Sequence, residues 1–114
     1  MLKGLGAMGD MAKMMKAAQE VQGKMAELQD QLARIVVVGE SGAGLVKARV
    51  TAKGEITGLD ISPTILVASE KEVVEDLIIA ALRDAQAKAT SRSQQEMARM
   101  GEAMGLPADF KMPF

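Results

Sequence analysis

The sequence contains no cysteine and no histidine. These two absences exclude disulfides, thiolate nucleophiles, imidazole bases and the thiolate and imidazole ligands of a metal ion. Aromatic residues are nearly absent too, since Phe110 and Phe114 are the only two. Modules that stack the bases of single-stranded DNA or RNA need aromatic faces in the middle of a sheet. That class of nucleic-acid-binding protein is therefore excluded as well.

Long apolar runs are also missing. The longest, Ile35 to Val38 and Leu77 to Leu82, are far too short to span a bilayer, and the first residues lack the pattern of a secretory signal. We therefore expect a cytoplasmic protein without a membrane partner. A chain of 114 residues has room for one domain with a modest core, so we expect a single domain over 1–114 whose core a partner chain completes.

An apolar seam with the spacing of a helix runs from Met11 to Ile35. Its members alternate by three and four, which is typical of a helix packed lengthwise against another helix. Asp10 stands where an N-cap is expected, so we predict a helix over 10–34, about 37 Å long, after a flexible start at residues 1–9. Such a helix would project from the domain; the alternative is an ordinary amphipathic helix lying on the sheet. The seam consists of Met11, Met14, Ala18, Val21, Met25, Leu28, Leu32 and Ile35.

The next part of the chain shows the period of two that is typical of strands. Strands are expected at residues 35–38, 45–52 and 56–61, joined by a glycine-rich loop and by a turn at residues 53–55. Two flanking helices would cover one face of these strands, which predicts an α+β fold with a three-stranded antiparallel sheet. In the middle strand we expect a buried face of Val46, Ala48, Val50 and Ala52 and a wet face of Lys47, Arg49, Thr51 and Lys53.

The glycine-rich stretch GESGAG at residues 39–44 has three candidate interpretations. A phosphate-binding or dinucleotide-binding loop would enter a helix, whereas this stretch leads into a strand pattern. A hydrolase elbow at Ser41 would need a base, and the chain has no histidine. Adjacent acids such as Glu75 and Asp76 point apart on a helix, so they form neither an acid–base pair nor a metal cage. We therefore expect a hairpin connection with glycines at positive φ, and a protein that is not an enzyme and has no cofactor.

A second long helix is predicted from the capping box that Ser69 and Glu72 would form. The first half of this helix is richly apolar, and beyond Ala89 the sequence becomes polar. The polar half is therefore expected to leave the core as a second arm. A proline-containing tail is expected at residues 105–114.

Positive charge gathers in two segments, although the net charge of the chain is −1, which excludes binding by bulk charge. Residues 1–24 and residues 83–99 each hold four basic and two acidic residues, or +2. Both segments are expected at the ends of the helices farthest from the sheet. The helix dipole favours cations in the second segment but disfavours Lys13 and Lys16 in the opening turns of the first helix. We therefore expect these two lysines to serve something other than helix stability; the alternative is that they are ordinary solvated lysines. The candidate DNA-binding residues are Lys13, Lys16, Lys24, Lys88, Arg92 and Arg99.

Four stretches spread over nearly the whole chain share the pattern of one family: MMKAAQ at 14–19, GESGAGLVK at 39–47, KEVVEDLIIAALRDA at 71–85 and GLPADFKMPF at 105–114. With them the chain resembles the YbaB/EbfC family of bacterial nucleoid-associated proteins. The resemblance implies a homodimer in which three-stranded sheets join and long helices project like tweezers. It also implies binding of duplex DNA with little sequence preference, and roles in nucleoid organisation, gene expression and recombination or repair.

The resemblance extends to some of the candidate residues. Lys16 and Lys24 match basic positions in the first-helix pattern of the family, whereas the other four candidates come from charge alone. Gly23 stands where the family more often has a charged or polar helix former. We therefore expect phosphate contacts by basic residues at the arm tips of a non-catalytic homodimer.

Two alternatives to DNA binding stay open. A coiled-coil scaffold would grip a protein partner through the Met-rich faces of its helices. A membrane-surface helix is less favoured, because mixed charges rather than a basic face flank the apolar stripe of the first helix.

Overall fold

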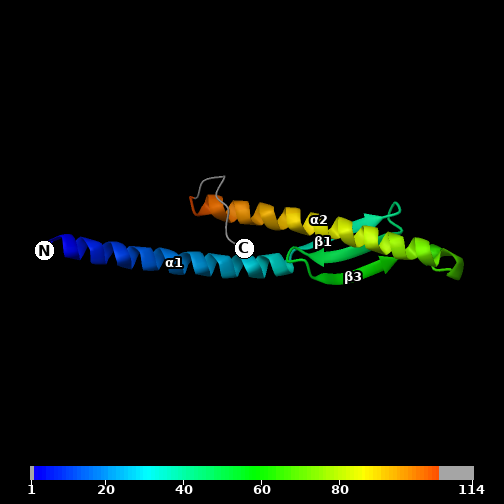
Figure 1. Ribbon diagram of the computed structural model, residues 1–114, viewed down its shortest axis with the longest axis horizontal. Coiled ribbons are helices and arrows are strands. Elements are labelled where there is room, and N and C mark those ends of the chain that lie inside the picture. The colour runs from blue at the N-terminus through cyan, green and yellow to red at the C-terminus, as the bar shows by residue number, and fades with distance from the viewer. Residues whose placement is uncertain (1, 106–114) are drawn as a thin grey trace.

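The computed structural model describes residues 2–105, with side chains described from residue 9 onward. The tail predicted at residues 105–114 lies, except for Gly105, outside this range. Two long helices and a three-stranded antiparallel sheet form an elongated molecule of 83 × 22 × 18 Å (Figure 1), and the predicted α+β fold is confirmed. In chain order the elements are α1 (Leu2–Arg34), β1 (Val36–Ser41), β2 (Val46–Thr51), β3 (Ile56–Ile61), the 3-10 turns η1 (Pro63–Ile65) and η2 (Ala68–Glu70), and α2 (Lys71–Ala103).

The first helix begins at Leu2, so the start predicted at Asp10 is wrong. Residues 2–9, expected as a flexible start, continue the helix, and Asp10 lies inside it instead of at an N-cap. Each glycine in this stretch lowers helix propensity by about 1 kcal/mol. However, no proline interrupts the stretch, and an existing helix gains one hydrogen bond with each added residue. The helix therefore reaches 33 residues.

The sheet is a meander in the order β1-β2-β3, with both pairs antiparallel. β1 is longer than predicted, because its pairing with β2 continues as far as Ser41 opposite Val46. The connection is therefore a tight turn, in which Gly42, Ala43 and Gly44 have φ angles of 59°, 54° and 90°. The predicted hairpin is confirmed, and glycine supplies two of its three left-handed conformations.

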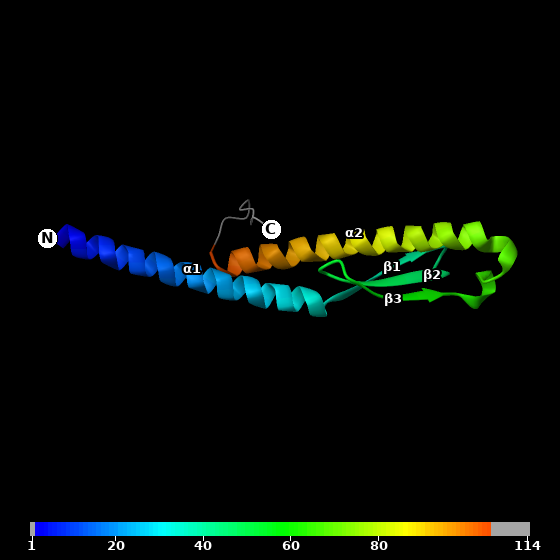
Figure 2. The same cartoon turned by 60° about the horizontal axis from the view of Figure 1, so that its bottom comes forward.

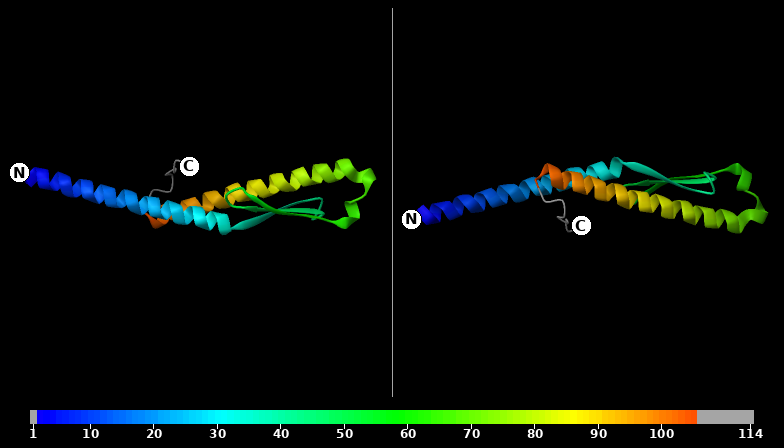
Figure 3. Two further views of the ribbon diagram at one scale, coloured as in Figure 1. Left: turned by 90° about the horizontal axis from the view of Figure 1, so that it is seen from below. Right: turned by 90° about the horizontal axis from the view of Figure 1, so that it is seen from above.

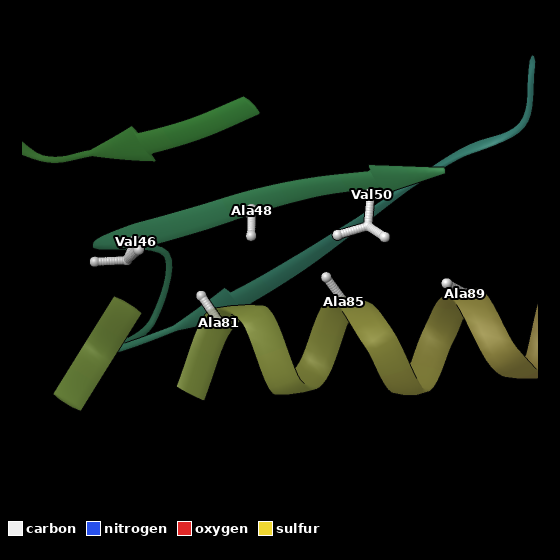
Figure 4. Packing of buried hydrophobic residues seen from close by; sticks show 6 residues of the cluster. All are labelled: Val46, Ala48, Val50, Ala81, Ala85 and Ala89. Atoms are coloured by element: carbon white, nitrogen blue, oxygen red, sulfur yellow. The ribbon is translucent and has the colours of Figure 1, made fainter. Parts of the chain in front are cut away.

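α2 lies along one face of the sheet, over β1 and β2 (Figures 2 and 4). The predicted buried face of β2 is confirmed, and small side chains make the contact on both elements. Thr51, predicted on the wet face, is instead buried at the end of β2, where its hydroxyl accepts a hydrogen bond from the Glu55 N–H of the following turn. The core of this layer consists of Val46, Ala48, Val50, Ala81, Ala85 and Ala89.

Gly39 marks a very close approach between β1 and α2. A Cβ atom at this position would lie 2.5 Å from the Ala81 carbonyl oxygen and 2.6 Å from the Ala85 Cα atom. Carbon atoms in contact prefer about 3.5–4.0 Å. No side chain therefore fits between strand and helix here, and glycine is required for packing rather than for an unusual φ angle.

The second half of α2 packs against the end of α1 through a separate cluster. Leu28 and Leu32 of α1 are buried together with Ala52, and Met97 and Met100 of α2 pack against them. α2 consequently ends beside the middle of α1, and the first half of α1 extends beyond it alone (Figures 1 and 3). Of the two predicted arms, α1 projects from the molecule, whereas the polar half of α2 lies against α1.

α2 begins at Lys71, and the capping box predicted for its start is not formed. That prediction was therefore wrong. Glu70 is the N-cap, and no side chain caps the helix. The chain enters α2 from the turn η2, in which the Glu70 N–H donates to the Val67 carbonyl oxygen. Ser69 belongs to that turn, so it precedes the N-cap instead of occupying it.

Candidate nucleic-acid interface

α1 carries three exposed lysines, Lys13, Lys16 and Lys24, of which the first two lie on its projecting half. At about 100° per residue they fall within an arc of about 80°, beside the apolar seam. Leu28 is the first buried residue of α1 among the described side chains, and Lys16 lies about 18 Å before it along the helix axis. Lys13 and Lys16 therefore lie beyond the end of α2, which stops three residues after Met100.

The three lysines differ in their ion pairs. The Lys24 Nζ atom lies 3.7 Å from the Glu27 Oε2 atom. Because both side chains are well exposed, this pair contributes only about 0.5 kcal/mol. Lys13 and Lys16 form no ion pair with any side chain between residues 9 and 105. Lys13 and Lys16 therefore differ from Lys24 in having no ion-paired carboxylate among the described side chains.

Lys88 lies beside the sheet, so its predicted place at an arm tip is wrong. Its Nζ atom is 3.0 Å from Asp84 Oδ2 and donates a 3.0 Å hydrogen bond to the Val38 carbonyl oxygen. The Glu40 N–H donates to the same Asp84 oxygen at 2.9 Å. This N–H, followed by Lys88, lowers the pKa of the Asp84 carboxyl and keeps it charged. Lys88 thus fastens α2 to the outer edge of β1, and Asp84 balances its charge.

Arg92 and Arg99 share one carboxylate on α2. Arg92 Nε lies 3.1 Å and Arg99 Nη1 lies 3.3 Å from the same oxygen, Glu96 Oε1. The Glu96 side chain is 10% exposed, whereas those of Arg92 and Arg99 are 43% and 71% exposed. The structure therefore brings these two predicted residues together, with one net positive charge, around a nearly buried acid.

Asp84 and Glu96 were not predicted from the sequence as partners of the basic residues. Both acids stand three or four residues from a basic residue, which is the spacing at which side chains meet on a helix. This spacing was a usable signal for the pairs themselves. It does not reveal that Glu96 is nearly buried or that Lys88 reaches β1, because both facts depend on where α2 lies.

Apolar surface remains uncovered along β3. Leu59 pairs with Ala48 and Ile56 pairs with Val50, so both β3 side chains share the face of the sheet that carries α2. Because α2 covers β1 and β2, Leu59 is still 42% exposed and Ile56 57% exposed. On the projecting half of α1 the exposed apolar residues include Met11, Met14 and Met15.

Neither a metal site nor a membrane span is found in the described part of the chain. Between residues 9 and 105 no group of three acidic side chains is placed to hold a metal ion. Within the described range neither helix has an apolar stretch that is long enough to cross a membrane.

Comparisons with known proteins agree with this architecture. The sequence matches the YbaB/EbfC DNA-binding family over residues 8–104. The structure resembles the crystal structure of the uncharacterized protein HP0035 from Helicobacter pylori with a TM-score of 0.69. That match has 18% sequence identity and covers 78% of this chain and 94% of the other. At this identity the likeness shows a shared fold.

Proposed function

The chain belongs to the YbaB/EbfC DNA-binding family, and from this premise we propose that it binds duplex DNA as a non-catalytic homodimer with little sequence preference. It would reside at the nucleoid in the cytoplasm and contribute to nucleoid organisation, gene regulation and recombination or repair. The observation that carries the proposal is the projecting half of α1. There Lys13 and Lys16 are exposed and have no ion-pair partner among residues 9–105.

The lysines of α1 suit contact with phosphates. Lys13 and Lys24 lie about 16 Å apart along the helix axis, a length over which duplex DNA carries several phosphate charges. Lysine is a flexible point charge, and phosphate contacts position a protein without reading the bases. Arg92 and Arg99 on α2 would add a second set of contacts, and Lys88 a weaker one because Asp84 balances it.

The two edges of the sheet support a homodimer joined through β3. On β1, Asp84 and Lys88 occupy backbone groups of the outer edge, which protects that edge from pairing with another strand. Among the described residues no side chain of another element caps the backbone of β3. A second copy paired along β3 would extend the sheet and cover Ile56 and Leu59, in a self-complementary interface typical of twofold dimers.

One observation favours the alternative of a scaffold for a protein partner. Met11, Met14 and Met15 are 64%, 71% and 64% exposed on the projecting half of α1. Methionine is common at surfaces that bind varied partners, because its side chain is flexible and polarizable. Association through this surface would be nearly insensitive to salt, whereas binding of DNA phosphates weakens with salt.

Fluorescence anisotropy of a labelled random-sequence duplex tests the proposed function. We expect saturable binding at low salt, and an affinity whose logarithm falls with the logarithm of salt concentration by about 0.9 per phosphate contacted. Competition by an unrelated unlabelled duplex should be as effective as competition by the same sequence. Absence of saturable binding at low salt would refute the proposal and favour the protein scaffold.

A further inference from the structure

The face of α2 that touches the sheet continues beyond the end of the sheet. Ala81, Ala85 and Ala89 lie on this face against β2 (Figure 4). The same three- and four-residue spacing leads next to Arg92, Glu96 and Arg99. A stripe of small residues thus passes into a stripe of two arginines around one acid.

The bonding within this stripe leaves much of each arginine unused. Both ion pairs end on one oxygen, Glu96 Oε1, at 3.1 Å from Arg92 and 3.3 Å from Arg99. A guanidinium group has five N–H donors, and each arginine spends one of them on Glu96. Glu96 is 9% exposed, so it lies beneath the arginines, whose outer donors face solvent.

We propose that Glu96 is an internal competitor of the DNA backbone for Arg92 and Arg99. The inference rests on the proposed DNA binding and concerns how strongly the α2 arginines take part in it. A carboxylate and a phosphodiester are both anions that guanidinium groups bind through charge-assisted hydrogen bonds. In the free protein the Glu96 carboxylate holds one donor of each arginine. DNA gains the full contact of both arginines only when it displaces this carboxylate.

The competition has a direct consequence for affinity. Each arginine that leaves Glu96 for a phosphate exchanges one ion pair for another, so the net gain is small while the acid keeps its charge. Binding of DNA at α2 is therefore held below the level that two unpaired arginines would give. Glu96 limits the affinity of the protein without touching DNA itself.

The variant Glu96→Gln tests this inference, with Glu102→Gln as the matched control. Both changes remove one negative charge near the end of α2, but Glu102 is exposed and has no ion pair among the described side chains. Duplex binding is measured by anisotropy between about 50 and 200 mM salt. Each released arginine that contacts a phosphate should steepen the salt slope by about 0.9, and two arginines by about 1.8. As salt rises fourfold, Glu96→Gln should therefore lose about 3- to 12-fold more affinity than Glu102→Gln. At the low-salt end it should bind DNA more tightly than the control.

A second variant separates the contacts from the net charge. Glu96→Asp keeps the charge but shortens the side chain by one methylene group, which weakens its hold on both arginines. We expect its DNA affinity at low salt to lie between those of the unchanged protein and Glu96→Gln. In a chain that also carries Arg92→Gln and Arg99→Gln, the gain from Glu96→Gln should disappear. Circular dichroism of each variant verifies that the helices remain folded.

The outcomes separate this inference from the proposed function. If the unchanged protein binds DNA and Glu96→Gln behaves like Glu102→Gln, the competition is refuted while DNA binding stands. A gain that persists without the two arginines refutes the competition too. If neither the unchanged protein nor Glu96→Gln binds duplex DNA at low salt, both proposals fail together. Binding that appears only in Glu96→Gln would refute the proposed function of the unchanged protein, and the inference that rests on it would fail as well.

Discussion

Replacement of Gly39 by alanine tests the account of how the helix and sheet are held together. The new Cβ atom would lie 2.5 Å from the Ala81 carbonyl oxygen and 2.6 Å from the Ala85 Cα atom. Both neighbours are backbone atoms of α2, so neither can turn aside as a flexible side chain could. The helix must withdraw from β1 by about 1 Å to reach the usual contact distance.

The cost of this movement can be worked out from the packing that it opens. A gap of about 0.5–1 Å removes a quarter to a half of the dispersion attraction across an interface, here the layer that contains Val46 and Val50. Overpacking of this kind costs about 1–3 kcal/mol. Alanine restricts the unfolded chain more than glycine, which returns about 0.4–1 kcal/mol. We therefore expect Gly39→Ala to lower the free energy of unfolding by about 1–2 kcal/mol.

Urea unfolding followed by far-UV circular dichroism measures this loss, at one protein concentration for all variants because a dimer would make stability depend on it. Gly23→Ala is the matched control, since a Cβ atom at Gly23 meets nothing within 4 Å. On an exposed helix position it should raise stability by about 0.5–1 kcal/mol. A Gly39→Ala protein as stable as the unchanged one would refute the close packing described between β1 and α2.

Two further variants test the edges of the sheet. Because the Glu40 N–H and Lys88 lower the pKa of Asp84, its carboxylate stabilises the fold at neutral pH and loses this effect as the pH falls through the lowered pKa. Urea unfolding near pH 7 should therefore show that Asp84→Asn is less stable than the unchanged protein. The difference in stability should disappear in acid below about pH 3.9. A difference that does not change with pH would contradict this account. Sedimentation equilibrium should show that Leu59→Lys shifts a dimer toward monomer, whereas Leu66→Lys, also on an exposed residue but outside β3, does not. Equal dimerisation of both variants would contradict pairing through β3.

The sequence was most informative where a pattern repeats. The alternation in β2 identified its buried face, because side chains on a strand point to opposite sides whatever covers them. The hairpin turn could also be predicted from its glycines, since left-handed φ angles are a local requirement of the turn. The predicted start of α1 at Asp10 is wrong, because glycines before Asp10 indicate a helix boundary whereas the helix continues through them to Leu2.

The features that the sequence did not reveal depend on distances between elements. Nothing local distinguishes Gly39 from the turn glycines a few residues later, yet it is needed for the approach of α2. Glu96 resembles any solvated helix acid until α2 is placed against α1. The predicted position of Lys88 at an arm tip is wrong for the same reason, since its hydrogen bond to the Val38 carbonyl oxygen depends on the packing of α2 against β1.

Charge reversal at the tip of α1 tests the central claim that its lysines hold DNA. The control for Lys16→Glu is Lys71→Glu, the same change at the start of α2. The start of α2 lies at the end of the molecule opposite the tip of α1 (Figure 1). In duplex titrations by anisotropy, Lys16→Glu should weaken binding about tenfold and make the salt slope smaller by about 1 for each phosphate that the protein no longer binds. Lys71→Glu should bind nearly as well as the unchanged protein. If Lys16→Glu bound DNA as tightly as Lys71→Glu, with folding intact in both, the α1 arm would not be the DNA-binding surface.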